Sequence, residues 1–168
     1  GTLPESKLVR TFHRKAGAVV WTDCGDHDVP HADRGTPTYA GLKTDCYLSI
    51  VEFMNPMHRL WSDTRWNKLT LAHGCYWKKC NFCDISLDYI GRYDPAPVDR
   101  LVDQMVSLIR ETGSSGFHWV DEAAPPVLLR QLSKHLIDRG VVATWWGNIR
   151  FEKTFNADLT RLMAEAGC

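Results

Sequence analysis

The chain has 168 residues, enough for one ordinary domain that buries roughly 70% of its unfolded surface. Its 20 basic side chains balance 20 acidic ones without long runs of either sign, so nothing indicates nucleic acid or an anionic membrane as a partner. No apolar run approaches the roughly 20 residues that span a bilayer, and the start GTLPESKLVR lacks an apolar signal core. These features favour a cytoplasmic protein.

Residues 1–68 show little helical periodicity. The β-rich runs LVRTFHR and AVVWT flank KAG, which predicts a hairpin with a glycine turn. The following segment, CGDHDVPHADRGTPTYAGL, is dense in Gly, Pro and Asp and is typical of an extended connector. Its Cys24, His27 and His31 are possible metal ligands, but their spacing matches no zinc template.

From residue 69 the pattern alternates between strand and helix three times. Short β-rich runs at 69–72, 117–120 and 141–146 are typical of buried parallel strands. Each run precedes a helical segment. The first helix has one apolar face, formed by Leu101, Met105, Leu108 and Ile109, and ends at Gly113. The second has Pro125 and Pro126 in its first turn and Gly140 at its end, and the third has Asn156 as its N-cap. The predicted fold class is α/β, with three parallel β/α units of the length found in β/α barrels.

Three parallel strands cannot close a barrel, and the sequence stops after a helix, where a fourth strand should begin. We therefore expect a fragment of a longer polypeptide, with a hairpin and linker over residues 1–68 and the first half of a barrel over residues 69–168. The last run, 141–146, would then be an apolar open edge, which favours self-association.

The segment LTLAHGCYWKKCNFCD places Cys75, Cys80 and Cys83 within nine residues. In a reducing compartment this clustering favours metal binding over disulfides. A structural zinc site takes four ligands, and a ferredoxin cluster takes four thiolates. Three thiolates therefore indicate an iron–sulfur cluster with one iron left open for a substrate or cofactor. The alternative is a non-catalytic zinc-binding α/β module, with His73 or Cys168 as the fourth ligand.

The run CYWKKCNFC, after a first strand and before a first helix, resembles the cluster loop of the radical S-adenosylmethionine enzymes. The resemblance implies that Cys75, Cys80 and Cys83 hold a 4Fe-4S cluster whose fourth iron is chelated by S-adenosylmethionine. The family's usual spacing is CxxxCxxC, whereas this chain has four residues between its first two cysteines. Phe82, just before the last cysteine, matches an apolar position that packs against the adenine in the family.

Further resemblances lie where the second and third strands end. In FHWVDEAAP, Asp121 and Glu122 resemble a degenerate form of the family's GGE-like segment, which holds the amino group of S-adenosylmethionine; Asp121 alternatively caps a helix. In WWGNIRFE, Trp146, Asn148 and Arg150 would overhang the same rim. Arg150 suits the cofactor carboxylate or a substrate anion, and a surface salt bridge is the alternative.

The segment TPTYAGL, followed by Tyr47, resembles the bridge found in the branch of the family with an N-terminal cobalamin-binding domain. That domain would lie upstream of Gly1, and the chain has no DxHxxG motif for the corrin, so cobalamin is expected only in a full-length parent. The resemblance implies an electron donor such as a flavodoxin or ferredoxin and radical chemistry on an unknown small-molecule or peptide substrate. Methyl transfer, methylthiolation and rearrangement stay open, and the isolated fragment is expected to be inactive.

Overall fold

The computed structural model describes residues 4–27, 29–46 and 66–168. The chain divides into two compact units, Gly1–Arg34 and Gly35–Cys168. The sequence predicts a boundary between residues 68 and 69 instead. In the structure, the second unit begins at Gly35, within the predicted linker, and Tyr39 packs against its core. Tyr47 and the rest of the predicted bridge, up to residue 65, lie outside the described residues.

The first unit contains the predicted hairpin. Its strands β1 (Thr11–Lys15) and β2 (Ala18–Thr22) pair antiparallel, and Phe12 faces Trp21 with 4.6 Å between ring centroids. Ala16 and Gly17 form the turn with φ of +48° and +85°, as tight two-residue hairpin turns require. Two short 3-10 helices accompany the hairpin, η1 (Glu5–Lys7) and η2 (His31–Asp33).

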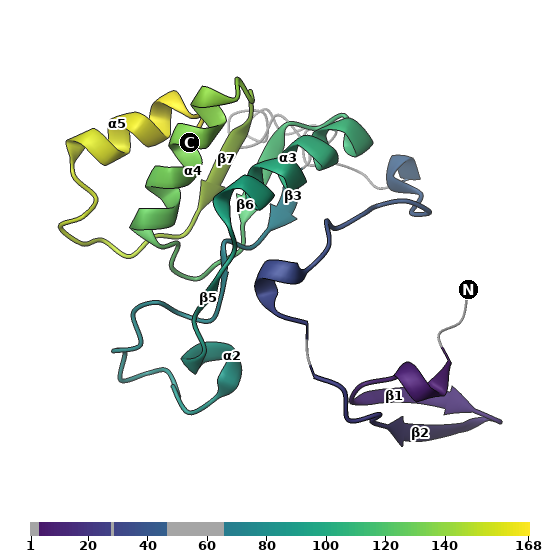
Figure 1. The fold of residues 1–168 in the computed structure, drawn as a ribbon. Helices are drawn as coiled ribbons and strands as arrows, with labels where there is room; N and C mark the ends of the chain where they lie inside the picture. The colour runs from purple at the N-terminus through teal and green to yellow at the C-terminus, as the bar shows by residue number, and fades with distance from the viewer. Residues whose placement is uncertain (1–3, 28, 47–65) are drawn as a thin grey trace. The chain divides into compact units, whose positions relative to one another are not determined.

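The second unit contains a three-stranded parallel sheet in the order β3-β6-β7 (Figure 1), which confirms the predicted α/β class and the parallel pairing. The strands are β3 (Trp66–Leu69), β6 (Gly116–Trp119) and β7 (Thr144–Gly147). Each is offset from its predicted run by one to three residues at either end, because an apolar, β-rich run does not by itself mark which residues form the hydrogen-bonded ladder.

Three helices follow the strands, and in Figure 1 α4 lies between its two neighbours. They are α3 (Val98–Thr112), α4 (Pro126–Asp138) and α5 (Ala157–Glu165); the short helices are α2 (Asp88–Gly91) and η3 (Thr44–Cys46). The predicted ends are confirmed, since Pro126 lies in the first turn of α4 and Gly140 follows its last residues with φ of +62°. Gly113 ends α3 with φ of +68°, and the Asn156 side chain accepts a hydrogen bond from the Leu159 amide at 3.0 Å.

The two faces of the sheet differ. Leu69, Phe117, Trp119 and Trp145 alternate along the strands and are buried in the core with the apolar helix faces. The other face carries a row of directly paired residues across the three strands, Lys68, His118 and Trp146. The His118 ring stacks on the Trp146 ring at 3.7 Å, and Lys68 Nζ lies 3.3 Å from His118 Nδ1. The pKa of His118 is lowered, mainly by burial and to a smaller extent by the positive charge of Lys68.

The outer edge of β7 is not an open row of backbone groups. The Trp145 amide donates to the Gly167 carbonyl at 2.9 Å, and the indole Nε1 donates to the Ala166 carbonyl at 2.8 Å. The turn after α5 thus pairs with the edge that the sequence predicts to be uncovered, which weakens the physical argument for self-association there. Separately, no helix in the described ranges is both long enough and apolar enough to cross a membrane.

The largest difference from the prediction lies where β3 ends. The sequence predicts the first strand over 69–72, but Leu71 and Ala72 donate their amides to the buried carboxylate of Asp121, at 2.8 and 2.9 Å. The side chain of Asp121 binds both amides directly after the last bond between β3 and β6, and the chain leaves the sheet at this point. Ala72–His73 then forms β4, which pairs antiparallel with β5 (Asp94–Pro95), a short pair that the sequence did not predict.

Replacing Asp121 by alanine should lower the free energy of unfolding by about 1–3 kcal/mol at neutral pH, because two buried amides lose their acceptor. Chemical denaturation monitored by tryptophan fluorescence measures this. Glu122→Ala is the matched control, since Glu122 is the exposed carboxylate next along the chain, and its effect should stay within about 0.5 kcal/mol.

The pH dependence supplies a second readout for the same variant. Burial raises the pKa of Asp121 above its ordinary 3.8, so the folded chain binds this proton more tightly than the unfolded chain. The advantage of the wild type over Asp121→Ala should therefore shrink as pH rises above 3.8, and level off above the shifted pKa. Equal stability of both proteins at all pH values would contradict the role of this carboxylate.

Candidate functional site

The three clustered cysteines lie on one loop, residues 74–93, which we call the cysteine loop. Its two ends are held together by the β4–β5 pair and by the Cys75 amide, which donates to the Ile90 carbonyl at 3.1 Å. Gly74 has φ of +72°, and a Cβ there would overlap the Arg92 carbonyl oxygen. We call this place, where the two ends of the cysteine loop meet, its neck. The neck requires a glycine for two independent reasons, the positive φ and the close approach of the Arg92 carbonyl.

The cysteines differ in their surroundings. Cys75 is half-buried, and its Sγ accepts a hydrogen bond from the Trp77 amide at 3.4 Å, whereas Cys80 and Cys83 are exposed. Phe82, the residue implied to face an adenine, is 97% exposed beside Cys83. All six cysteines of the chain are free thiols. The part of the chain that the structure describes contains no group of three His, Cys, Asp or Glu side chains arranged to hold a metal.

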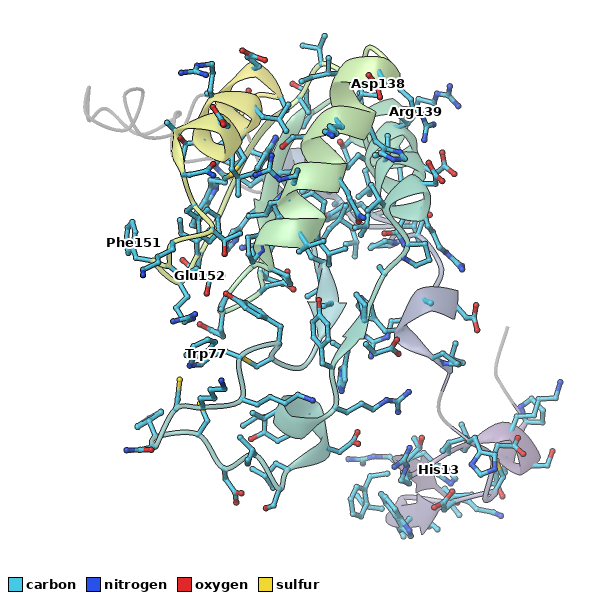
Figure 2. All side chains as sticks on the ribbon, turned by 60° about the vertical axis from the view of Figure 1, so that its left-hand side comes forward. His13, Trp77, Asp138, Arg139, Phe151 and Glu152 are labelled. Atoms are coloured by element: carbon cyan, nitrogen blue, oxygen red, sulfur yellow. The ribbon has the colours of Figure 1, made fainter. Side chains whose placement is uncertain are left out.

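The Cys75 end of the loop contacts the segment that follows β7. The guanidinium carbon of Arg150 lies 3.3 Å from the centroid of the Trp77 ring, and Arg150 Nη2 donates to Glu152 Oε2. Figure 2 shows Trp77 of the cysteine loop next to Glu152. Next to Trp77 in the loop, Tyr76 meets Tyr93 edge to face with 6.5 Å between ring centroids. These contacts bring the predicted cofactor residue Arg150 to the cysteine loop.

Asp121 and Glu122 leave the sheet at the end of β6. Glu122 is exposed at the rim, whereas both oxygens of Asp121 accept backbone amides of the β3 exit. The Asp121 carboxylate thus bonds to the strand exit rather than to α4, whose N-cap is Pro125. The exits of β6 and β7 are also tied together, because the Ala124 amide donates to the Asn148 carbonyl at 2.8 Å.

The two residues considered as a fourth zinc ligand lie in different places. His73 is at the neck of the cysteine loop, with Nε2 4.0 Å from Asp88 Oδ2. Cys168 follows Gly167, whose carbonyl pairs with the outer edge of β7. Since β6 separates β7 from β3, Cys168 lies across the sheet from the strand that leads into the cysteine loop.

The sequence reasoning missed Tyr76, Trp77 and Glu152 as parts of this region. The only local signal was that two aromatic residues, Tyr76 and Trp77, directly follow a candidate ligand cysteine. Trp77 and its partner Arg150 lie 73 positions apart in the chain, and the parallel sheet brings them together.

The donor set suits an iron–sulfur cluster. Three free thiols share one short loop, and the Trp77 amide already donates to one of their sulfurs, which is the kind of hydrogen bond that tunes such clusters. Arg150 Nε is buried without a hydrogen-bond partner among the described residues, so an N–H donor is available for an anionic group. Cys80 and Cys83 must approach Cys75 for all three to bind one cluster.

Comparison with known proteins adds no identification. Neither a family model, nor a curated protein, nor a solved structure matches this chain.

Gly74→Ala should open the neck of the cysteine loop, because its Cβ meets the Arg92 carbonyl in addition to the cost of a positive φ. Trypsin cleavage after Lys78 and Lys79, followed by mass spectrometry, should accelerate markedly relative to the wild type.

Gly140→Ala is the matched control. Gly140 has φ of +62° but no atom within 4 Å of the position that a Cβ would take, so this variant should lose about 1–2 kcal/mol of stability and keep the wild-type cleavage rate in the loop. Equal loop cleavage in the two variants would show that the neck does not depend on the close approach at Gly74.

Proposed function

We propose that this chain is part of a radical S-adenosylmethionine enzyme, comprising a hairpin, a linker and the first three β/α units of a partial barrel. The observation that carries the proposal is that the cysteine loop and the β3 exit leading into it meet the ends of the other two strands. The loop follows β3, Asp121 and Glu122 follow β6, and Arg150 follows β7 and stacks on Trp77. The carboxyl ends of parallel strands are where β/α proteins bind ligands.

In this proposal Cys75, Cys80 and Cys83 hold a 4Fe-4S cluster. When bound, the cluster and S-adenosylmethionine supply the chemistry, namely a one-electron cleavage that yields a 5′-deoxyadenosyl radical able to take hydrogen from a substrate. The chain's own residues bind and orient. The Trp77 amide donates to the Cys75 sulfur, and the buried N–H of Arg150 suits a carboxylate.

The two carboxylates of the β6 exit take different roles. Glu122 is exposed at the rim and is the residue we assign to an amino group of the cofactor. Asp121 already uses both oxygens on the β3 exit, so its role is to position the loop rather than to touch the cofactor. Phe82 would reach an adenine only if the exposed part of the loop folds inward, because its side chain contacts little in the present arrangement.

The face of the sheet opposite the core is the side we assign to the substrate. In a β/α barrel the helices cover the outer face of the strands and the other face lines the interior. Here that other face presents Lys68, His118 and Trp146 in one row. Substrate identity and the use of cobalamin stay open, and an external electron donor such as a flavodoxin or ferredoxin is required by the chemistry.

Anaerobic reconstitution with iron and sulfide should give a brown protein with about four irons per chain. Changing Cys75, Cys80 or Cys83 to serine should each strongly reduce the iron and sulfide content, because each removes one of only three protein ligands. Metal analysis and visible absorption measure both.

Cys24→Ser and Cys46→Ser are the matched controls, since these cysteines lie outside the cysteine loop and should leave iron loading unchanged. A colourless protein that retains one tightly bound zinc would contradict the proposal and favour the zinc-binding module instead.

A further inference from the structure

The cysteine loop has one anchored arm and one exposed arm. The anchored arm, residues 75–77, is held by the Cys75 amide bonded to Ile90, by Tyr76 against Tyr93, and by Trp77 under Arg150. The exposed arm, residues 78–85, contains Cys80, Phe82 and Cys83, and every residue in it is exposed. Before any metal binds, the Cys75 thiol is therefore held in place, whereas the thiols of Cys80 and Cys83 lie on the exposed arm.

Of these three contacts, only the one between Trp77 and Arg150 joins the anchored arm to the segment that follows β7. The guanidinium carbon lies 3.3 Å from the ring centroid, Arg150 is half-buried, and Glu152 accepts a hydrogen bond from the guanidinium on the same segment. Lys79 also lies over the Trp77 ring, at 5.0 Å, but it belongs to the loop itself and fixes nothing to the sheet. Partly buried cation–aromatic contacts of this kind contribute more than exposed ones.

We infer that Trp77 is a positioning residue that, by stacking on Arg150, holds Cys75 in place so that cluster loading requires only the exposed arm to close. This inference rests on the proposed function for its purpose. Its structural part, the selective anchoring of Cys75, is independent of any metal. A ligand that is already placed loses less conformational entropy when the metal binds, so the anchor should speed cluster assembly.

The anchoring is tested without metal by alkylating the full chain with iodoacetamide and following each cysteine by mass spectrometry. Cys75 should react more slowly than Cys80 and Cys83. Trp77→Ala and Arg150→Ala should each accelerate alkylation of Cys75 by about 5- to 30-fold, the factor expected for losing a partly buried cation–aromatic contact, and leave Cys80 and Cys83 unchanged.

Two conservative variants make the test specific. Trp77→Phe keeps an aromatic face under Arg150, and Lys79→Ala removes the other cation over the ring, so both should stay within about twofold of the wild-type rate at Cys75. An unchanged Cys75 rate in Trp77→Ala and Arg150→Ala would overturn the inference. So would equal acceleration at all three cysteines, which would indicate general unfolding of the loop.

Reconstitution with iron and sulfide then separates the inference from the proposed function. Trp77→Ala should reach the wild-type iron content more slowly, and Trp77→Phe should restore the rate. Equal loading rates in Trp77→Ala and the wild type would contradict the positioning role while leaving the proposed function intact. If no variant, nor the wild type, binds a cluster but the alkylation pattern holds, the anchor stands and the proposed function fails.

Discussion

The position of the cysteine loop depends on the two hydrogen bonds that Asp121 accepts from the amides of Leu71 and Ala72. The Val120 amide still pairs with the Leu69 carbonyl at 2.9 Å, so the sheet continues up to that point and the side chain of Asp121 takes over directly after it. A carboxylate in this buried place is costly, as its raised pKa indicates. The two amides offset that cost, and together they determine where the chain turns out of the sheet.

The neck and the anchored arm then determine which part of the loop is pre-ordered. Because Gly74 has no side chain, the Arg92 carbonyl can approach its backbone closely. The Cys75 amide donates to the Ile90 carbonyl, and Trp77 stacks on Arg150. Cys80 and Cys83 have no comparable restraint in the described structure. Since the free energy of metal binding is also free energy of ordering, a loop built in this way concentrates the conformational change of cluster binding in a few exposed residues.

Much of the fold was predictable from local sequence signals, whereas the site was predictable only in part. Gly113 and Asn156 mark their helix ends through backbone chemistry that acts within a few residues, and the helix positions followed from them. The first strand was misplaced because LTLA is apolar and β-rich, and only the distant Asp121 shows that its second half leaves the ladder. The stacking of Arg150 on Trp77 was likewise invisible, because it joins two loops through the parallel sheet. The cysteine spacing suggested the chemistry, but the separation of an anchored thiol from two exposed ones needed the structure.

The most direct test of the central claim, that the cysteine loop holds a cluster open to S-adenosylmethionine, is an electron paramagnetic resonance measurement on the reconstituted and chemically reduced chain. The account predicts a 4Fe-4S signal whose shape changes when S-adenosylmethionine is added, because the cofactor would take the one iron that the three thiolates leave open. A reduced cluster whose signal is the same with and without S-adenosylmethionine would contradict the account.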